Sequence, residues 1–364
     1  MGLEAEHSLK TNSVGVHPFG PTISNEVKNK VLPTNRRQVL ILENRMKVIK
    51  GIKQNISLKN YTTFKIGGKV KYFAEVKNLQ ELKKIIQWAK DNHLSFFILG
   101  NGSNVLFSDQ GYQGIIIKIK NSTLKKINQT IILVDAGLHL GEFLNKCVQN
   151  KWRGFEWMAG IPGTIGGAIY GNAGAFGKEM KNFVKKIITL DSQNFKIKHY
   201  LLSQCKFGYR ESIFKKNKEI ILAVELKVKK GNQAEIQKII QENWQYKLQH
   251  QMFKYPSAGS IFKNIIFKET PYQKAYNAKK QLVKIQDEEV QVKGGKISAG
   301  WFIEKCGLKG KIRGGAKISD FHANVIINFK QAKAKDILFL INLIKKSVWK
   351  KFQITLEEEI VIVK

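Results

Sequence analysis

The hydrophobic pattern of the chain changes period several times after residue 60, which predicts a mixture of helices and strands. The most regular helical pattern covers residues 332–352, where five apolar side chains recur every three or four positions. A second amphipathic helix is expected after Asn78, which can cap it together with Glu81. Further helices are expected at residues 140–151, 234–251 and 297–306.

Strands are predicted where apolar residues form short runs or alternate with polar ones. Residues 184–230 alternate in this way, most notably at 220–228, and indicate antiparallel strands. The individual strand ranges are 71–76, 95–99, 114–120, 131–135, 220–228, 323–328 and 355–363. Because helices and strands follow no regular βαβ order, the fold class they indicate is α+β.

Two segments lack a sustained pattern. Residues 1–50 carry polar, Pro-, Gly- and Asn-containing pieces, and they predict a poorly ordered N-terminal extension. Residues 267–293 are rich in charge, and they predict a surface loop.

Length and composition limit the class of protein. A chain of 364 residues can bury a sizeable core and is expected to form two or three domains. Its apolar runs are too short to span a membrane, so no membrane partner is expected. Cys147, Cys205 and Cys306 are far apart in the sequence, so we expect no metal site and no disulfide framework. A cytoplasmic location is the expectation.

The formal net charge of +34 suits two classes of partner, nucleic acids and anionic small molecules. The lysines are spread over nearly every segment instead of forming one block. This spread indicates a general compositional bias, and we expect no nucleic-acid partner.

Two glycine-rich, uncharged segments stand out in this lysine-rich chain. Seven glycines lie between Gly160 and Gly177, and Gly100–Asn104 follows a predicted strand. Such backbones can point N–H groups at a phosphate, although each segment alone is equally compatible with a tight turn. Taken together, they are better explained as two sides of one dinucleotide site. The candidate cofactor-binding residues are Gly100, Asn101, Gly102, Ser103, Asn104, Gly160, Ile161, Pro162, Gly163, Thr164, Gly166, Gly167, Asn172 and Gly174.

Three further places could carry chemistry. Arg210 lies among aromatic residues, where a guanidinium could stabilise developing negative charge, although a surface arginine would have the same sequence context. Ser260 follows Pro256 in what reads as a tight turn, in which a serine commonly bonds its own backbone. Residues 357–359 are three glutamates on a predicted strand, so the first and third share a face.

Seven motifs follow one another along residues 55–364. They are Asn60–Gly68, Gly100–Leu106, Gly160–Ala168 with Asn172–Gly174, Tyr209–Ser212, Pro256–Asn264, Ala299–Trp301 through Gly314–Ala316, and Leu356–Ile360. In this order they closely resemble the UDP-N-acetylenolpyruvoylglucosamine reductase (MurB) family, and their number makes the resemblance specific. The forty-nine residues between Arg210 and Ser260 resemble the shorter class of this family, which lacks an extra substrate-capping loop.

The resemblance implies an FAD-binding domain of the vanillyl-alcohol-oxidase (PCMH) type in two subdomains, plus a smaller α+β substrate domain. It also implies NADPH as hydride donor and UDP-N-acetylglucosamine-enolpyruvate as substrate, and a monomer is expected. The ranges that we expect are 1–50 for the extension, 51–120 and 121–235 for the FAD subdomains, 236–353 for the substrate domain and 354–364 for a C-terminal strand with the catalytic glutamate.

The same resemblance implies roles for individual residues. Arg210 would stabilise the enolate, Ser260 would protonate C2 of the enolpyruvyl group, and Glu359 would assist at its carboxylate if it is protonated. Residues expected on the substrate side are Asn264, His322, Lys309 and Lys254, of which Lys254 would reach the UDP phosphates.

The chain departs from the family in places, and two other readings remain. Ile265 stands where relatives have proline after the Lys-Asn pair, and residues 1–50 have no family counterpart. One rival is a flavoprotein oxidase on the same fold, which would have no use for Arg210, Ser260 and Glu359 in register. The other rival is a basic nucleic-acid-binding protein, which would hold no flavin.

Overall fold

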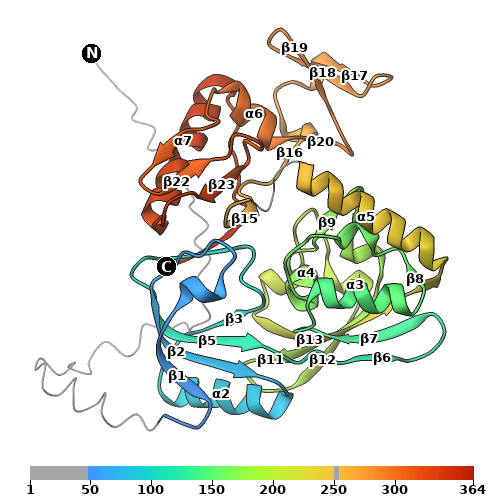
Figure 1. Ribbon diagram of the computed structural model, residues 1–364, viewed down its shortest axis with the longest axis vertical. Helices are drawn as coiled ribbons and strands as arrows, with labels where there is room; N and C mark the ends of the chain where they lie inside the picture. The colour runs from blue at the N-terminus through green and yellow to red at the C-terminus, as the bar shows by residue number, and fades with distance from the viewer. Residues whose placement is uncertain (1–47, 250–253) are drawn as a thin grey trace, which may run out of the picture.

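The computed structural model describes residues 48–249 and 254–364. In the described residues, the three sheets of four or five strands organise the fold, and the first two of them lie below the third in Figure 1. The predicted extension lies almost entirely outside the described residues, as do residues 250 and 251 of the predicted helix 234–251. The domain boundaries expected from the sequence stay a prediction.

The first sheet has four strands in the order β1-β2-β5-β3. β2 and β3 both run parallel to β5, and β1 pairs antiparallel with β2. Helix α2 packs against β2 and β5, and its start is capped as expected: Asn78 Oδ1 accepts a hydrogen bond of 2.9 Å from Glu81 N. The elements are β1 (Ile52–Ser57), β2 (Lys69–Val76), α2 (Leu79–Asp91), β3 (Phe96–Leu99) and β5 (Tyr112–Ile119).

The second sheet is antiparallel, with the order β12-β11-β13-β7-β6, which confirms the strands expected within residues 184–230. Helix α4 packs on β13 and β7, and α3 contacts α5. One hydrophobic core joins the faces of the first and second sheets. The elements are β6 (Leu124–Lys126), β7 (Ile131–Asp135), α3 (Leu140–Gln149), α4 (Ile165–Tyr170), β11 (Val184–Asp191), β12 (Ile197–Leu201), β13 (Glu219–Lys227) and α5 (Gln233–Gln249).

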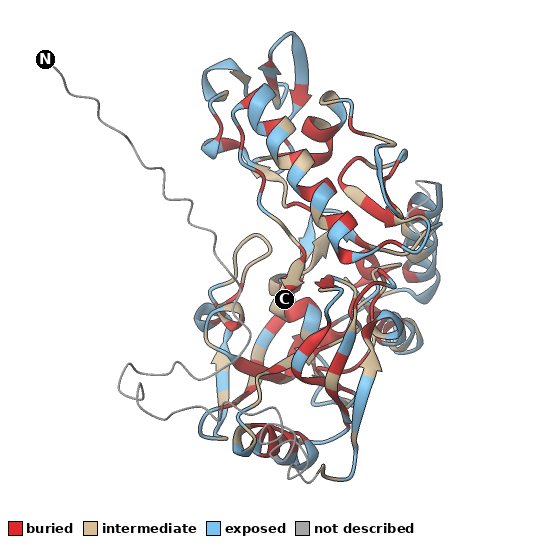
Figure 2. Ribbon diagram, turned by 90° about the vertical axis from the view of Figure 1, so that its left-hand side faces the viewer, coloured by how far each residue is buried: buried red, intermediate tan, exposed pale blue. Residues whose placement is uncertain are grey.

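The third sheet has the order β15-β23-β22-β21 and is covered by α7. Its core includes Phe64, Ile66 and Leu106, which come from the N-terminal part of the chain, so the third sheet and its helices pack directly onto residues that flank the first sheet. Figure 2 shows these buried faces in red. The elements are β15 (Ser257–Ser260), α6 (Ala299–Lys305), β21 (Ile312–Arg313), β22 (Ala316–Ile318), β23 (Val325–Asn328) and α7 (Ala334–Phe352).

The expectation of a surface loop at residues 267–293 was wrong. This segment holds an antiparallel meander of β17 (Tyr276–Asn277), β18 (Leu282–Ile285) and β19 (Glu288–Gln291), which projects at the upper right of Figure 1. Val283 and Val290 are buried and belong to the core of the third sheet. The many charges between these sparse apolar positions hid the alternating pattern.

Two other expectations need correction. Residues 257–260 form strand β15 instead of a tight turn, with an irregularity at Gly259, whose φ is 73°. The strand expected at 355–363 is regular only in β24 (Val361–Val363), which pairs in parallel with β4 (Val105–Phe107). Glu358 instead makes a single bridge to Phe262. The segment changes partner because it crosses from the third sheet to the loops of the first.

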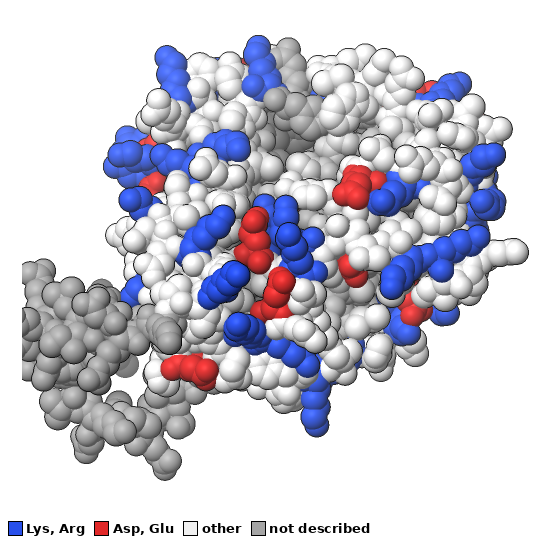
Figure 3. Space-filling view, turned by 60° about the horizontal axis from the view of Figure 1, so that its bottom comes forward, with Lys and Arg blue, Asp and Glu red and all other residues white. Residues whose placement is uncertain are grey.

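Charge is distributed over the surface shown in Figure 3, where Lys and Arg side chains lie among acidic and uncharged residues instead of forming one patch. Within residues 48–249 and 254–364, no helix combines the length and apolar character that crossing a membrane requires. In the same residues, no three His, Cys, Asp or Glu side chains are grouped as metal ligands.

Asp109 caps α7 across the boundary between the first and third sheets. Its two carboxylate oxygens accept hydrogen bonds from Ala334 N at 2.7 Å and Lys335 N at 3.0 Å. A carboxylate at this end of a helix satisfies free N–H groups and opposes the positive end of the helix dipole.

Replacing Asp109 by Ala should therefore lower the free energy of unfolding by about 1–2 kcal/mol. Urea denaturation followed by circular dichroism measures this change. Asp287→Ala, at an exposed position in the turn after β18, is the control and should change stability little. Equal effects of both substitutions would contradict the capping role.

Candidate active site

The two glycine-rich segments lie against each other. Gly100–Asn104 connects β3 to β4, and residues 160–164 lead into α4. A Cβ atom added at Gly100 would lie 2.7 Å from Thr164 Oγ1, and one added at Gly163 would lie 3.7 Å from Ser103 Oγ. The structure thus brings together the two loops that the sequence singled out.

The first of these loops offers unpaired backbone donors. No described residue accepts a hydrogen bond from the N–H groups of residues 101–104. Gly102 has φ 65°, and an added Cβ would lie 2.0 Å from the carbonyl oxygen of Tyr61. The buried hydroxyl of Thr63, whose N–H donates to Gly102 O, has no partner among the described residues. This open row of donors fits the diphosphate of a dinucleotide such as FAD.

Lys118 and His139, which the sequence analysis missed, lie next to the glycine-rich loops. Lys118 pairs in parallel register with Leu99, at the end of β3, and its Nζ lies 5.3 Å from the centre of the Tyr61 ring. Burial lowers the pKa of Lys118, and the neighbouring Lys120 lowers it further. His139, which bridges Thr164, also has a pKa lowered by burial and by the two lysines. The pairing of Lys118 with Leu99 and the bridge of His139 to Thr164 are tertiary contacts that the sequence does not show.

Arg210 lies at the tip of a turn closed by Gly208 and Glu211, whose N–H and C=O groups bond each other. Its φ of 57° is left-handed, which is uncommon outside glycine. Three contacts hold it: Nε donates to Glu359 Oε1 at 2.7 Å, Nη2 donates to Gly174 O at 2.9 Å, and Lys215 Nζ donates to the arginine's carbonyl oxygen at 2.7 Å. Gly174, expected at the cofactor, thus orients the guanidinium.

Glu359 faces Arg210 from the C-terminal segment. Its side chain is 18% exposed, and burial raises the pKa of its carboxyl above the ordinary value although Arg210 acts in the opposite direction. The more distant Lys215 and Lys263 also lower it. A carboxyl with a raised pKa beside a fixed arginine can bind a proton at a higher pH than an exposed glutamate does.

Ser260 lies on the strand next to the Glu359 segment. The residue after it, Ile261, accepts a hydrogen bond of 2.7 Å from Glu359 N. Ser260 is half-buried, at the end of β15. The three residues expected to be catalytic therefore come from three segments that meet at one place.

The four residues expected on the substrate side differ in the contacts that they make. Asn264 donates from its N–H to Tyr209 Oη at 3.1 Å, and its Oδ1 accepts from Ala299 N, so it joins the arginine turn to α6. His322 Nδ1 accepts a hydrogen bond of 3.2 Å from Asn324 N. Lys254 Nζ lies 5.9 Å from the ring centre of Phe321, the neighbour of His322. Lys309 instead pairs with Glu304 at 2.6 Å, and no described contact joins it to the others.

Asn172, expected at the cofactor, uses its side chain within the protein. The amide donates to Glu179 Oε2 and to Gly208 O, both at 2.8 Å, and its Oδ1 accepts from Lys181 N at 3.1 Å. The side chain is fully buried. It supports the turn that carries Arg210, so these hydrogen-bonding groups of the side chain are already used within the protein, and the backbone N–H of Asn172 donates to Ile169 O.

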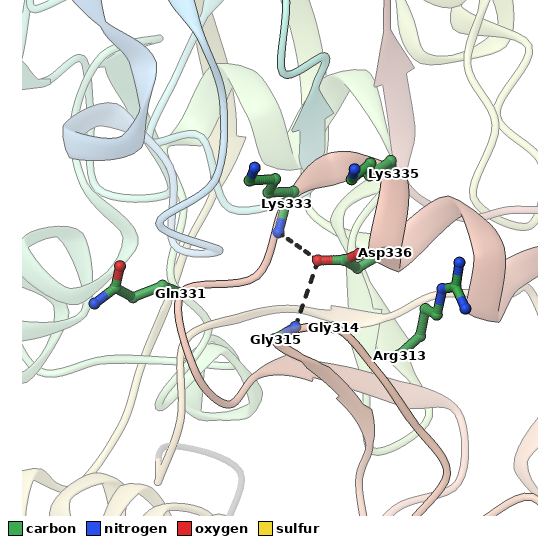
Figure 4. A pocket seen from close by; sticks show the side chains of 7 residues that line it. All are labelled: Arg313, Gly314, Gly315, Gln331, Lys333, Lys335 and Asp336. Atoms are coloured by element: carbon green, nitrogen blue, oxygen red, sulfur yellow. Dashed lines mark hydrogen bonds between the residues drawn. The ribbon is translucent and has the colours of Figure 1, made fainter.

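The Gly314–Ala316 motif lies in a different part of the molecule. A pocket of about 400 Å³ lies at the start of α7. Figure 4 shows the residues that line it, among which Asp336 Oδ2 accepts hydrogen bonds from Lys333 N and Gly315 N. A Cβ at Gly314 would lie 2.6 Å from the Asp336 carboxylate. This motif shapes the start of the helix, and none of the expected site residues lines the pocket.

Comparison with known proteins agrees with this geometry. Residues 70–192 match an FAD binding domain, and residues 249–363 match the C-terminal domain of UDP-N-acetylenolpyruvoylglucosamine reductase. The reductase of Alkaliphilus oremlandii is 37% identical over 84% of this chain and 91% of its own length. That of Caldanaerobacter subterraneus is 37% identical over 85% and 92%. The crystal structure of the Thermus caldophilus enzyme has a TM-score of 0.66 at 29% identity and covers 85% of this chain and 98% of its own.

These matches define the chain as a flavin-dependent oxidoreductase with an FAD-binding domain of the vanillyl-alcohol-oxidase type and a second, C-terminal domain. The predicted α+β fold class and the predicted cofactor are confirmed. The chain belongs to the UDP-N-acetylenolpyruvoylglucosamine reductase family.

Contact between the two glycine loops leads to a prediction about cofactor binding. Gly100→Ala would place a methyl group against Thr164 and push the loops apart, so FAD should bind at least about tenfold more weakly. Flavin absorbance after purification and a fluorescence titration with FAD measure this. Gly141→Ala is the control, because nothing lies within 4 Å of its added Cβ. Unchanged FAD affinity in Gly100→Ala would contradict the assignment.

Proposed function

We propose that this chain reduces UDP-N-acetylglucosamine-enolpyruvate to UDP-N-acetylmuramate, with FAD as cofactor and NADPH as hydride donor, in the synthesis of peptidoglycan precursors. The observation that carries the proposal is the meeting of Arg210, Glu359 and the Ser260 strand beside the glycine loops. We further propose that the enzyme is a cytoplasmic monomer.

Arg210 would stabilise the charge that develops during reduction. The chemistry that FAD supplies when bound is hydride transfer, from NADPH to C3 of the enolpyruvyl group. Addition at C3 leaves an electron pair at C2, which is delocalised into the substrate carboxylate. A guanidinium that Glu359 and Gly174 O hold in place would need little rearrangement to stabilise such oxygens as charge develops.

Ser260 would then give its proton to C2, which completes the addition of two hydrogens across the double bond. A hydroxyl is a weak acid in water, so this step depends on close placement and on nearby positive charge. Glu359 would contribute in its protonated form, as a donor to the enolate carboxylate. Burial favours that form, since it raises the pKa of the Glu359 carboxyl.

The substrate's nucleotide would lie on the third sheet. Lys254 and His322 flank Phe321, and Asn264 connects this side to the Arg210 turn. A lysine near the diphosphate would offset its charge. Lys309 has the weakest support as a substrate residue, because it pairs with Glu304 on the surface.

Ser260→Ala should separate the two half-reactions. Reduction of the flavin by NADPH should proceed at the wild-type rate, and reoxidation by the enolpyruvate substrate should fall at least about a thousandfold, because C2 then lacks its proton donor. Stopped-flow absorbance at the flavin bands measures both rates. Ser257→Ala, on the same strand, is the control. Loss of both half-reactions in Ser260→Ala would refute the assigned role.

The protonated form of Glu359 predicts a pH dependence. A carboxyl loses its proton as pH rises through its pKa, so the rate of flavin reoxidation should fall on the alkaline side of that raised value. Glu359→Gln cannot ionise, so its rate should be lower by about tenfold but without this decline. Rates of flavin reoxidation, measured across the pH range for wild type and Glu359→Gln, test this prediction. A decline that persists unchanged in Glu359→Gln would assign it to another group.

A further inference from the structure

Two ionic bridges run side by side between the Arg210 turn and the C-terminal segment. The first is the pair of Arg210 and Glu359, at 2.7 Å. In the second, Lys263 Nζ lies 2.8 Å from Glu211 Oε1 and 2.6 Å from Glu357 Oε1. Glu211 follows Arg210 directly, and Glu357 precedes Glu359 by two positions, so the second bridge joins the same two segments as the first.

Lys263 is well placed to hold these segments in register. Its side chain is 12% exposed, whereas that of Glu357 is 71% exposed. Its backbone N–H also donates to Glu357 O at 2.9 Å, so both its backbone and its side chain hold the C-terminal segment. Burial lowers the pKa of Lys263, but the two carboxylates outweigh it and the net pKa is raised, so Lys263 stays charged.

The Arg210 turn is also held by contacts to other parts of the molecule: Asn172 Nδ2 donates to Gly208 O, and Asn264 N donates to Tyr209 Oη. Arg210 lies outside any helix or regular strand, and its backbone is left-handed. Lys215 ties the turn to itself, through the carbonyl oxygen of Arg210 and through Glu211 Oε1 at 3.5 Å. Lys263 thus forms a second connection between this turn and the C-terminal segment, beside the pair of Arg210 and Glu359.

We propose that Lys263 is a positioning residue for the reduction of the enolpyruvyl group: by bridging Glu211 and Glu357, it sets Arg210 and Glu359 at their working distance. This inference rests on the proposed function. Displacement of a reacting group by about 1 Å can cost on the order of a hundredfold in rate, so a bridge of this kind has a measurable effect.

The same lysine acts on the protonation of Glu359 through its charge. The charged and titratable groups around Glu359 are Arg210, Lys215, Lys263, Glu211, Glu357 and Tyr209. Removing Lys263 takes one positive charge away from the surroundings of Glu359. It also leaves the negative carboxylates of Glu211 and Glu357 without the lysine that pairs with them. Both changes favour the protonated carboxyl, so the alkaline decline of the reoxidation rate should move to higher pH.

The chain offers a matched control on the same segment. Glu358 points to the other side and pairs with Lys345 of α7 at 3.0 Å. Lys263→Met and Lys345→Met each remove one lysine from neighbouring glutamates, but only Lys263 bonds to the turn that carries Arg210. Both purified holoenzymes would be compared with wild type in the two flavin half-reactions, by stopped-flow absorbance, and in thermal stability.

Lys263→Met should keep the NADPH half-reaction within about twofold of wild type and lower the maximal reoxidation rate at least about tenfold, while the substrate concentration at half-saturation changes less than about threefold. Its alkaline decline should shift upward in pH. Lys345→Met should stay within about twofold in both half-reactions. Lys263→Arg, which keeps the charge and can bridge two carboxylates, should recover most of the lost rate.

Glu357→Gln gives an independent test, because this exposed side chain can be changed without opening the core. It should lower reoxidation in the same direction as Lys263→Met but less. The proposal is overturned if neither Lys263→Met nor Glu357→Gln lowers reoxidation more than Lys345→Met, or if both half-reactions fall together. Failure of the substrate to reoxidise the wild-type flavin would instead refute the proposed function.

Discussion

The C-terminal segment Leu356–Val363 is the constraint on which the active-site geometry depends. β24 pairs with β4 beside the first sheet, and Glu359 N donates to Ile261 O on the third. Asn104, at the end of the first glycine loop, contacts the segment twice: its Nδ2 donates to Glu359 O at 3.0 Å and its carbonyl accepts from Val361 N at 2.9 Å. One short stretch of chain therefore places the Glu359 carboxyl relative to both the first glycine loop and the third sheet.

The three consecutive glutamates of this segment each pair with a different positively charged side chain. Glu357 meets Lys263, Glu358 meets Lys345 of α7, and Glu359 meets Arg210. Exposed pairs of this kind contribute little to stability, whereas a buried pair costs desolvation that its attraction offsets only in part. At Glu359 that cost appears as a raised pKa, which suits the role proposed for this carboxyl, to bind a proton beside an enolate.

Local rules in the sequence predicted much of this structure. The capping of α2 by Asn78 and the apolar stripe of α7 follow from short-range patterns, and the structure has both. The glycine loops could be paired because two uncharged, glycine-rich stretches are unusual in so basic a chain. The family motifs then supplied the candidate residues in order, although the roles assigned to Arg210, Ser260 and Glu359 stay predictions.

What the sequence could not show depends on tertiary contacts. Lys263 and Glu211 look like ordinary surface charges until the turn and the C-terminal segment are brought together. The meander at β17–β19 has too few apolar positions to be recognised among its charges, and its buried side is defined by the core that it meets. The side chain of Asn172 was expected at a cofactor, but only the fold reveals that Glu179, Gly208 and Lys181 occupy its hydrogen bonds.

An anaerobic visible spectrum of the purified wild-type protein tests the central claim most directly. NADPH would be added first, and UDP-N-acetylglucosamine-enolpyruvate second. The account predicts flavin bands that bleach with NADPH and return with the enolpyruvate substrate, which would establish cofactor, donor and acceptor in one experiment. Bands that bleach but do not return would contradict the assigned substrate. A protein without flavin bands, even after incubation with FAD, would contradict the whole account.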